Sequence, residues 1–277
     1  TYCMFCTDDK HPNDLLEKGH IDYIVRRAIK AGVDPIIAVK CASHHAARYF
    51  LLNNRGAIAP GFLADFVIID NFDDFNILEV YKKGKLMFDG KAVTPFEAPE
   101  IDPHLVKRSH ETFHVAHLEA KDFIEGRPRA VLGMVPGEIV TTDAGYAEKI
   151  SVEDDILKIA VIERHKNTHH IGIGYIKGYG LKSGAVATSI SHDSHNIIVV
   201  GTNEEDMAAA VNRVVELGGG IVVMDGGKVL GEVQLQIAGI MSEAPLIEVN
   251  EALENAKALA KDSAQADIDA AAQALVK

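Results

Sequence analysis

The sequence predicts a mixed fold that combines α/β and α+β segments, and three observations lead to this prediction. An apolar run at residues 2–6 ends in two acids and is followed by helical patterns. Residues 56–94 hold short strand patterns separated by turns. Beyond residue 98, strand patterns outnumber helical ones.

The apolar run at residues 2–6 predicts a buried strand that stops at Asp8 and Asp9, with Pro12 blocking further pairing. In α/β barrels, catalytic groups stand at the carboxyl ends of such strands, so Asp8 is the first candidate catalytic residue. The alternative is that Asp8 and Asp9 only cap the helix that follows. The residues alone leave both interpretations open.

Two helices are expected after the acid pair. Apolar residues recur at helical spacing over residues 21–29, and Gly32 is placed to end that helix. Asp34 and Pro35 then form a capping residue and a first-turn proline, which predict a second helix that runs to about Leu52.

A change of pattern near residue 56 predicts a small β unit that lasts to about residue 94, and a linker rich in proline and acids follows at residues 95–103. We therefore expect three segments: 1–55, 56–97 and 98–277. In the third segment, strands are predicted at 130–134, 156–163, 172–177, 184–189, 197–201, 220–224 and 228–232, with helices at 204–217 and 251–276. Gly218–Gly220 is interpreted as a helix stop and not as a phosphate loop, because it follows a helix and precedes a strand.

Composition narrows the function classes. The 277 residues carry 40 acids against 28 bases, a formal net charge of −12, which argues against a nucleic-acid partner. No apolar run approaches the ~20 residues of a membrane helix, and no export leader is visible. Three cysteines, an odd number, argue against a disulfide framework and indicate a cytoplasmic protein.

Three polar clusters deserve comparison. Cys3 and Cys6 suggest a zinc or redox pair, but thiols three apart in a strand diverge, so packing is the favoured interpretation. The string at residues 191–196, Ser-His-Asp-Ser-His-Asn, is either an active-site loop or a turn whose side chains bond their own backbone. The charged strand end at residues 163–165 is interpreted as a contact between domains.

Several strings resemble the adenine deaminase family of the amidohydrolase superfamily. The family's last barrel strand and the residues that follow it resemble residues 6–12 and 19–23 of this chain. The segment in which the superfamily's chain returns from the barrel to the β-sandwich resembles residues 55–67. Residues 177–185, 191–196 and 237–242 resemble the family's C-terminal domain. The resemblance implies the last strand and helices of a (β/α)8 metal-dependent hydrolase barrel, part of a small β-sandwich, and a mixed α/β C-terminal domain.

The resemblance also implies the hydrolytic deamination of adenine to hypoxanthine and ammonia by water activated on a divalent metal, Mn or Fe, with Zn possible. Asp8 matches the family carboxylate that holds the metal and moves a proton. We assign a catalytic role to His192 as well, and substrate binding to Asp9, Asp193 and His195.

The sequence departs from the family in one important way. The first-strand His-x-His pair of the family is absent, and so are its other metal ligands, so we expect this chain to be a fragment that is inactive alone. The expected partners are adenine, the N-terminal barrel portion and further copies of the chain. The alternatives are another amidohydrolase acting on a cyclic amine or amide, or a non-catalytic purine-binding or assembly module.

Overall fold

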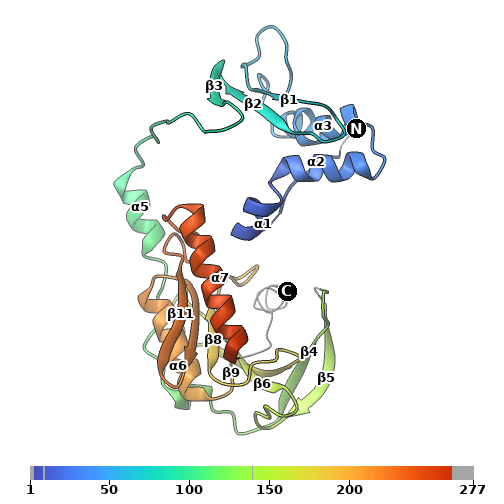
Figure 1. Ribbon diagram of the computed structural model, residues 1–277. Helices are drawn as coiled ribbons and strands as arrows, with labels where there is room; N and C mark the ends of the chain where they lie inside the picture. Colours follow the sequence, from blue (N-terminus) through green and yellow to red (C-terminus); the bar gives the residue numbers. More distant parts are fainter. Residues whose placement is uncertain (1–2, 9, 139, 264–277) are drawn as a thin grey trace. The chain divides into compact units, whose positions relative to one another are not determined.

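The computed structural model describes residues 3–8, 10–138 and 140–263, and the chain divides into two units, Thr1–Glu100 and Ile101–Lys277 (Figure 1). Its mixture of strand-rich sheets and few helices agrees with the predicted mixed α/β class. None of the helices in the described part of the chain has the length and apolar character needed to span a bilayer.

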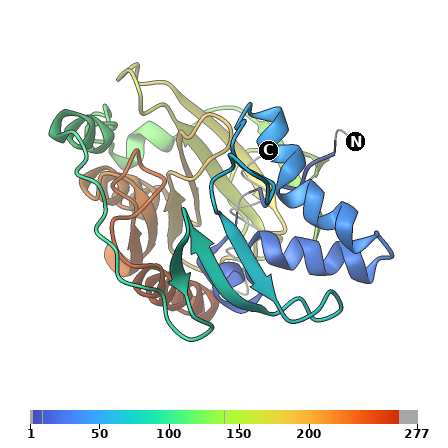
Figure 2. The same ribbon diagram turned by 90° about the horizontal axis from the view of Figure 1, so that it is seen from above.

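The described part of the first unit contains four short helices and one small sheet. The helices are α1 (Pro12–Glu17), α2 (Ile21–Lys30), α3 (Pro35–Ala42) and α4 (His44–Tyr49). The strands β1 (Phe66–Ile69), β2 (Ile77–Lys82) and β3 (Lys85–Phe88) pair antiparallel in that order, and they are the teal arrows of Figure 2. A small core joins the two layers, because Val25 and Ala38 pack with Phe75 and Ile69.

The predicted helix after Asp34 is confirmed at its start. The Asp34 carboxylate accepts a hydrogen bond of 3.0 Å from the backbone N–H of Ile37, which caps α3. The predicted continuation to about Leu52 is wrong, because the helix breaks at Ser43. The hydroxyl of Ser43 donates to the carbonyl of Val39 (2.6 Å), a local bond that competes with helical geometry.

The predicted strand at residues 2–6 is also wrong over its described part, residues 3–6. Residues 3–8 have no regular secondary structure, and Cys3 and Cys6 are exposed, so the packing role expected for them is not found either. A strand exists only through hydrogen bonds to a neighbouring strand. In the described part of this segment, the backbone N–H of Phe5 donates to the carbonyl of Cys41 (3.0 Å), which belongs to the helix α3 and not to a strand.

The second unit is built on an eight-stranded sheet in the order β11-β10-β8-β9-β6-β7-β4-β5. All neighbours pair antiparallel except β4 and β7. The strands are β4 (Arg129–Met134), β5 (Thr141–Ala147), β6 (Ile156–Ile162), β7 (Ile171–Lys177), β8 (Ala185–Thr188), β9 (Ile197–Gly201), β10 (Gly220–Asp225) and β11 (Lys228–Gln234). The seven predicted strands are all present, within two residues at each end.

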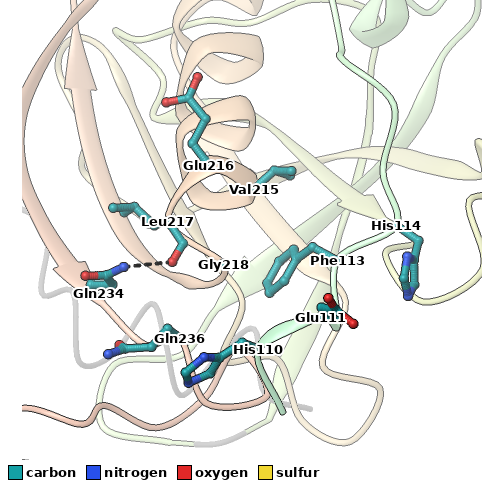
Figure 3. A pocket seen from close by; sticks show the side chains of 10 residues that line it. All are labelled: His110, Glu111, Phe113, His114, Val215, Glu216, Leu217, Gly218, Gln234 and Gln236. Atoms are coloured by element: carbon teal, nitrogen blue, oxygen red, sulfur yellow. Dashed lines mark hydrogen bonds between the residues drawn. The ribbon is translucent and has the colours of Figure 1, made fainter. Parts of the chain in front are cut away.

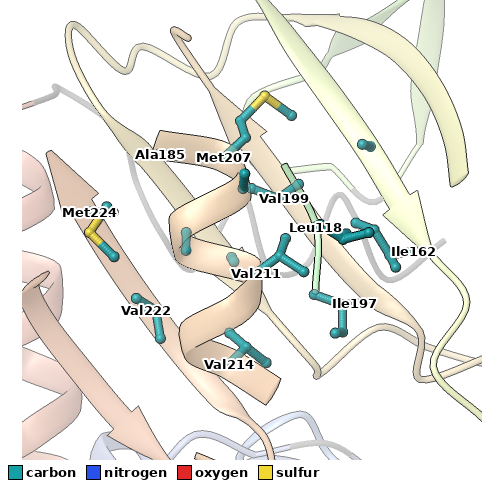
Figure 4. Packing of buried hydrophobic residues seen from close by; sticks show 14 of the residues in the cluster. Leu118, Ile162, Ala185, Ile197, Val199, Met207, Val211, Val214, Val222 and Met224 are labelled. Atoms are coloured by element: carbon teal, nitrogen blue, oxygen red, sulfur yellow. The ribbon is translucent and has the colours of Figure 1, made fainter. Parts of the chain in front are cut away.

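The central strands are apolar on both faces, and a helix covers each face. On one face, Met207, Val211 and Val214 of α6 (Glu204–Glu216) pack on Val199 and Val222 (Figure 4). On the other face, α7 (Leu246–Ser263) packs on an equivalent layer of strand residues. Alternating side chains of one strand point to opposite faces, so β9, with all five residues buried, contributes to both cores.

Three elements of the second unit were not predicted: α5 (Pro103–His110), the short 3-10 helix η1 (Ala120–Phe123) and the edge strand β5. The residues of β5 are mostly exposed and carry no apolar alternation, so periodicity could not reveal them. Helix α7 begins earlier than the predicted 251, and the last part of that predicted helix, 264–276, lies outside the described residues.

Candidate functional site

Asp8 lies in the first unit, in an irregular segment. It is exposed and has a left-handed backbone conformation, with φ of +49°. The segment is held from the helices, because Nδ1 of His45 donates to the carbonyl of Cys3 (2.8 Å). On the far side of Asp8, the Lys10 ammonium donates to the carbonyl of Gly19 (3.3 Å). Asp9, the predicted substrate-binding neighbour, falls outside the described residues.

The His192–His195 loop, defined as residues 191–196, connects β8 to β9 in the second unit. The loop is a tight turn, since the N–H of His195 donates to the carbonyl of Ser191 (2.5 Å). The rings of His192 and His195 pack edge to face, with their centroids 4.8 Å apart. Asp193 is exposed at the tip of the turn. The loop thus brings His192 and His195 together, while Asp8 belongs to the other unit.

Contacts from outside the loop hold its backbone. A ring nitrogen of His165, Nε2, lies 2.9 Å from the carbonyl oxygen of Ser194. Nε of Arg164 donates to the carbonyl of His195. Of the loop's own side chains, the Ser194 hydroxyl lies 3.4 Å from the N–H of Asn196, a long hydrogen bond. The alternative in which the loop's own side chains fix the turn therefore accounts for only part of its geometry.

Arg164 is the residue that sequence reasoning missed. It is 2 % exposed, and burial lowers the pKa of its guanidinium. We interpreted residues 163–165 as a contact between domains, yet Arg164 is enclosed within its own unit. No pattern in the sequence indicates a buried arginine, because the residue type is mostly exposed and follows a charged neighbour here.

The turn at residues 237–241 lies against the His192–His195 loop. The hydroxyl of Ser189, at the end of β8, donates to the carbonyl of Gly239 (2.5 Å) and accepts from the N–H of Gly220 (2.8 Å). Arg164 Nη2 donates to the carbonyl of Ala238 (2.9 Å). Two of the family strings, 191–196 and 237–242, are therefore neighbours in space. This adjacency could not be read from the sequence.

The third family string, residues 177–185, lies at the opposite end of β8. Tyr179 and Leu181 are buried in the core, where burial raises the pKa of the Tyr179 hydroxyl. The hydroxyl of Ser183 donates to the carboxylate of Asp225 (3.0 Å) in the β10–β11 hairpin. This string supports the fold and does not meet the His192–His195 loop within the unit.

A cleft of about 680 Å³ opens on the second unit between the segment after α5, the end of α6 and the end of β11 (Figure 3). Its lining mixes acids, histidines and amides, and Gln234 donates to the carbonyl of Leu217 (3.1 Å). None of the predicted site residues that the structure describes lines it. Two residues of the lining contact the arginine that holds the loop. The centroid of the Phe113 ring lies 4.3 Å from the Arg164 guanidinium carbon, and the N–H of His114 donates to the Arg164 carbonyl (2.8 Å).

Glu163, next to Arg164, organises the turn between β6 and β7. Its carboxylate accepts hydrogen bonds from the backbone N–H groups of His165 (2.6 Å), Lys166 (2.9 Å) and Thr168 (3.1 Å), and from the Thr168 hydroxyl (2.8 Å). Desolvation acts to raise the pKa of this carboxyl, but the hydrogen bonds stabilise the ionised form and lower the pKa to about 2.

We expect this carboxylate to contribute stability above its unfolded-state pKa of 4.5, and the contribution to disappear as the pH falls from there to about 2. In Glu163→Gln, urea unfolding should show a stability deficit at neutral pH that shrinks with acidification. Glu153→Gln, an exposed control in the same unit, should show no such trend. A deficit that stays constant from pH 7 to about pH 2 would contradict the assignment.

Comparison with known proteins now gives the family. Residues 138–275 match the sequence model of the adenine deaminase C-terminal domain, and residues 1–87 match that of the amidohydrolase family. The adenine deaminase of Kosmotoga olearia is 44% identical over 272 residues. The chain belongs to the adenine deaminase family. The resemblance inferred from residues 6–12, 191–196 and 237–242 is thereby confirmed.

Other relatives give the same result. The adenine deaminase of Petrotoga mobilis is 42% identical over 263 residues, and that of Brucella melitensis is 39% identical over 268 residues. These alignments cover 91% and 94% of this chain but only 45% of each relative, and the Kosmotoga alignment covers 94% and 46%. The chain thus spans about half the length of the curated relatives it matches.

Proposed function

We propose that this chain contributes to the hydrolytic deamination of adenine to hypoxanthine and ammonia, as part of a longer adenine deaminase. One observation carries the proposal: an amidohydrolase segment and an adenine deaminase C-terminal domain follow one another in a chain that is 39–44% identical to adenine deaminases. A cytoplasmic location and a homo-oligomeric state belong to the same proposal.

The finer fold assignment is also part of the proposal. Residues 1–55 would be the end of a (β/α)8 barrel, 56–97 a β-sandwich segment and 98–277 the C-terminal domain. The surface of the first unit supports an N-terminal barrel portion as partner, because α3 is apolar almost all round, and such helices are normally buried. Large apolar side chains are exposed at Ile36, Ile37, Tyr49, Phe50, Leu51, Leu52, Val67, Ile68 and Leu78.

The family implies a divalent metal, and the described donors of this chain do not by themselves make a site for one. Among the described residues, no three His, Cys, Asp or Glu side chains are grouped closely enough to hold an ion. Asp8 would be one ligand of a set completed by the partner portion. The expected metal is Mn or Fe, with Zn possible, as the family implies.

The proposed roles follow from the reaction. A water molecule adds to C6 of adenine, the C6–N bond breaks, and ammonia leaves while the oxygen remains on the ring. The Asp8 carboxylate would accept a proton from the water and deliver it to the leaving amine. His192 would assist proton transfer, and Asp9, Asp193 and His195 would contact the base. Under this assignment, Asp8 and the His192–His195 loop act in the same reaction.

The test compares this chain alone with a hybrid that joins it to the part of the Kosmotoga olearia enzyme preceding the matched region. We expect no measurable hypoxanthine from the chain alone, even with added Mn²⁺ or Fe²⁺, and robust turnover from the hybrid. Chromatography of products from adenine, other purines and dihydropyrimidines would give the substrate. Turnover by the chain alone, or a hybrid that hydrolyses dihydropyrimidines and ignores adenine, would contradict the proposal.

A further inference from the structure

We propose that Arg164 is a positioning residue, whose buried guanidinium fixes the backbone of the His192–His195 loop. An effect of Arg164 on catalysis rests on the proposed function of that loop. The geometric part of the inference stands on the described contacts of the second unit alone.

Arg164 joins three segments that are far apart in the sequence. Nε donates to the carbonyl of His195, Nη1 donates to the carbonyl of Thr112 (3.0 Å) and lies 3.2 Å from its hydroxyl, and Nη2 donates to the carbonyl of Ala238 (2.9 Å). In return, the carbonyl of Arg164 itself accepts from the N–H of His114 (2.8 Å). One side chain therefore ties together the segment after α5, the loop and the 237–241 turn.

The hydrogen-bond partners of the buried Arg164 guanidinium are unusual. Among the residues that the structure describes, its hydrogen-bond acceptors are carbonyl and hydroxyl oxygens, and no described carboxylate pairs with it. Burying a cation is costly, and only well-formed charge-assisted hydrogen bonds offset that cost. Arg213 offers the contrast, since it makes a two-point ion pair to Glu232 (2.8 and 2.9 Å) at a half-exposed site.

The fork shape of the guanidinium matters as much as the charge. Donors that point in three directions from one rigid plane can satisfy three separate carbonyls at once. Lysine concentrates its donors at a single point and cannot span the same acceptors. A substitution that keeps only the charge should therefore release at least one of the three segments.

The backbone at Gly239 packs closely against the Phe113 ring and the Arg164 guanidinium. Gly239 has φ of +76°, and a Cβ atom there would lie 2.8 and 2.9 Å from the Phe113 ring and 3.1 Å from Arg164 Nη2. The Phe113 ring in turn stacks on the guanidinium. A methyl group at Gly239 would therefore push on the arginine without removing its charge, which provides a second and independent way to disturb the same contacts.

The experiment is NMR spectroscopy of the full 277-residue chain with isotope-labelled histidines, and it records the imidazole signals. The variants His192→Gln and His195→Gln assign the two loop signals. In Arg164→Met and Arg164→Lys we expect these two signals to shift or broaden. The signals of His44 and His45, in the other unit, should stay in place. Arg213 is the control for an arginine that only stabilises the fold. Arg213→Met should lower the melting temperature and leave the two loop signals in place.

The second arm covers the case in which Arg164→Met does not fold. Gly239→Ala should move the same two signals, while Gly227→Ala, with a similar φ (+73°) and nothing within 4 Å, should not. Loop signals that stay unchanged in the folded variants among Arg164→Met, Arg164→Lys and Gly239→Ala would overturn the inference. So would equal shifts in Gly227→Ala.

Kinetics of the hybrid enzyme separate this inference from the proposed function. If both hold, Arg164→Lys should lower kcat by up to about 100-fold with a smaller change in KM, because misplacing a catalytic group by about 1 Å has that effect. Moved loop signals with unchanged kcat would retain Arg164 as the positioning residue and reject the catalytic role of the loop. Unmoved signals with lowered kcat would reject the positioning inference alone.

Discussion

Replacing Gly184 with alanine is expected to abolish the cooperative folding of the second unit. Gly184 precedes β8 with φ of +77°, and a Cβ atom there would lie 2.0 Å from the carbonyl oxygen of Met224. That oxygen belongs to β10, which pairs with β8 through Ala185 and Met224, so neither strand can retreat without losing the register of the central sheet. Backbone strain and clash together should cost more than ~4 kcal/mol, a large part of the stability of a typical domain.

The control is Gly137→Ala, because Gly137 has almost the same backbone conformation, with φ of +75°, and nothing within 4 Å. This variant should lose only about 1 kcal/mol, the cost of a left-handed alanine. Urea unfolding followed by circular dichroism would measure both variants. Equal losses in the two would show that backbone conformation alone, and not the approach of β10, requires glycine at 184.

The central sheet was predictable because its strands are buried on both faces. Apolar runs such as residues 197–201 need no alternation to be recognised, and their ends are marked by glycine or polar turns. The hairpin at residues 225–228 follows from Asp-Gly-Gly-Lys, and the structure pairs Asp225 with Lys228 around Gly226 and Gly227, which have φ of +56° and +73°. These strands and this turn are determined by residues close together in the sequence, so they could be predicted from it.

Local chemistry could not decide the N-terminal segment. Residues 3–8 carry the pattern of a buried strand, but burial and pairing depend on neighbours that the pattern does not contain. The exposed edge strand β5 shows the converse, because pairing with β4 creates a strand from residues with little strand character. Strand assignment thus succeeded where the side chains carry the signal and failed where only the partner does.

The residues of the candidate site also fall into two groups, those that the sequence indicates and those that only the fold identifies. His192 and His195 could be chosen as candidates because histidines in a polar turn between two apolar strands are visible in the sequence. Arg164 and Gly239 could not, because their role depends on three segments that meet only in the fold. A string such as 237–242 indicates family membership, but the sequence does not show what it touches.

His192→Ala in the hybrid enzyme is expected to lower kcat by about 100-fold or more, the usual contribution of a residue that transfers a proton in the transition state. His192 is half-buried on a loop, and its ring packs on that of His195. Removing the ring should therefore leave the melting temperature of the second unit within a few degrees of its original value.

The matched control is His170→Gln, an exposed histidine in the same unit and outside the loop, which should leave kcat and KM unchanged. The division between kcat and KM identifies the role of His192: a fall in kcat indicates proton transfer, whereas a rise in KM with constant kcat indicates substrate binding alone. Because Asp8 is expected to carry the principal proton, Asp8→Asn and His192→Ala should combine non-additively if the two residues act on one transition state. Strictly additive losses would mean that the loop acts independently of Asp8.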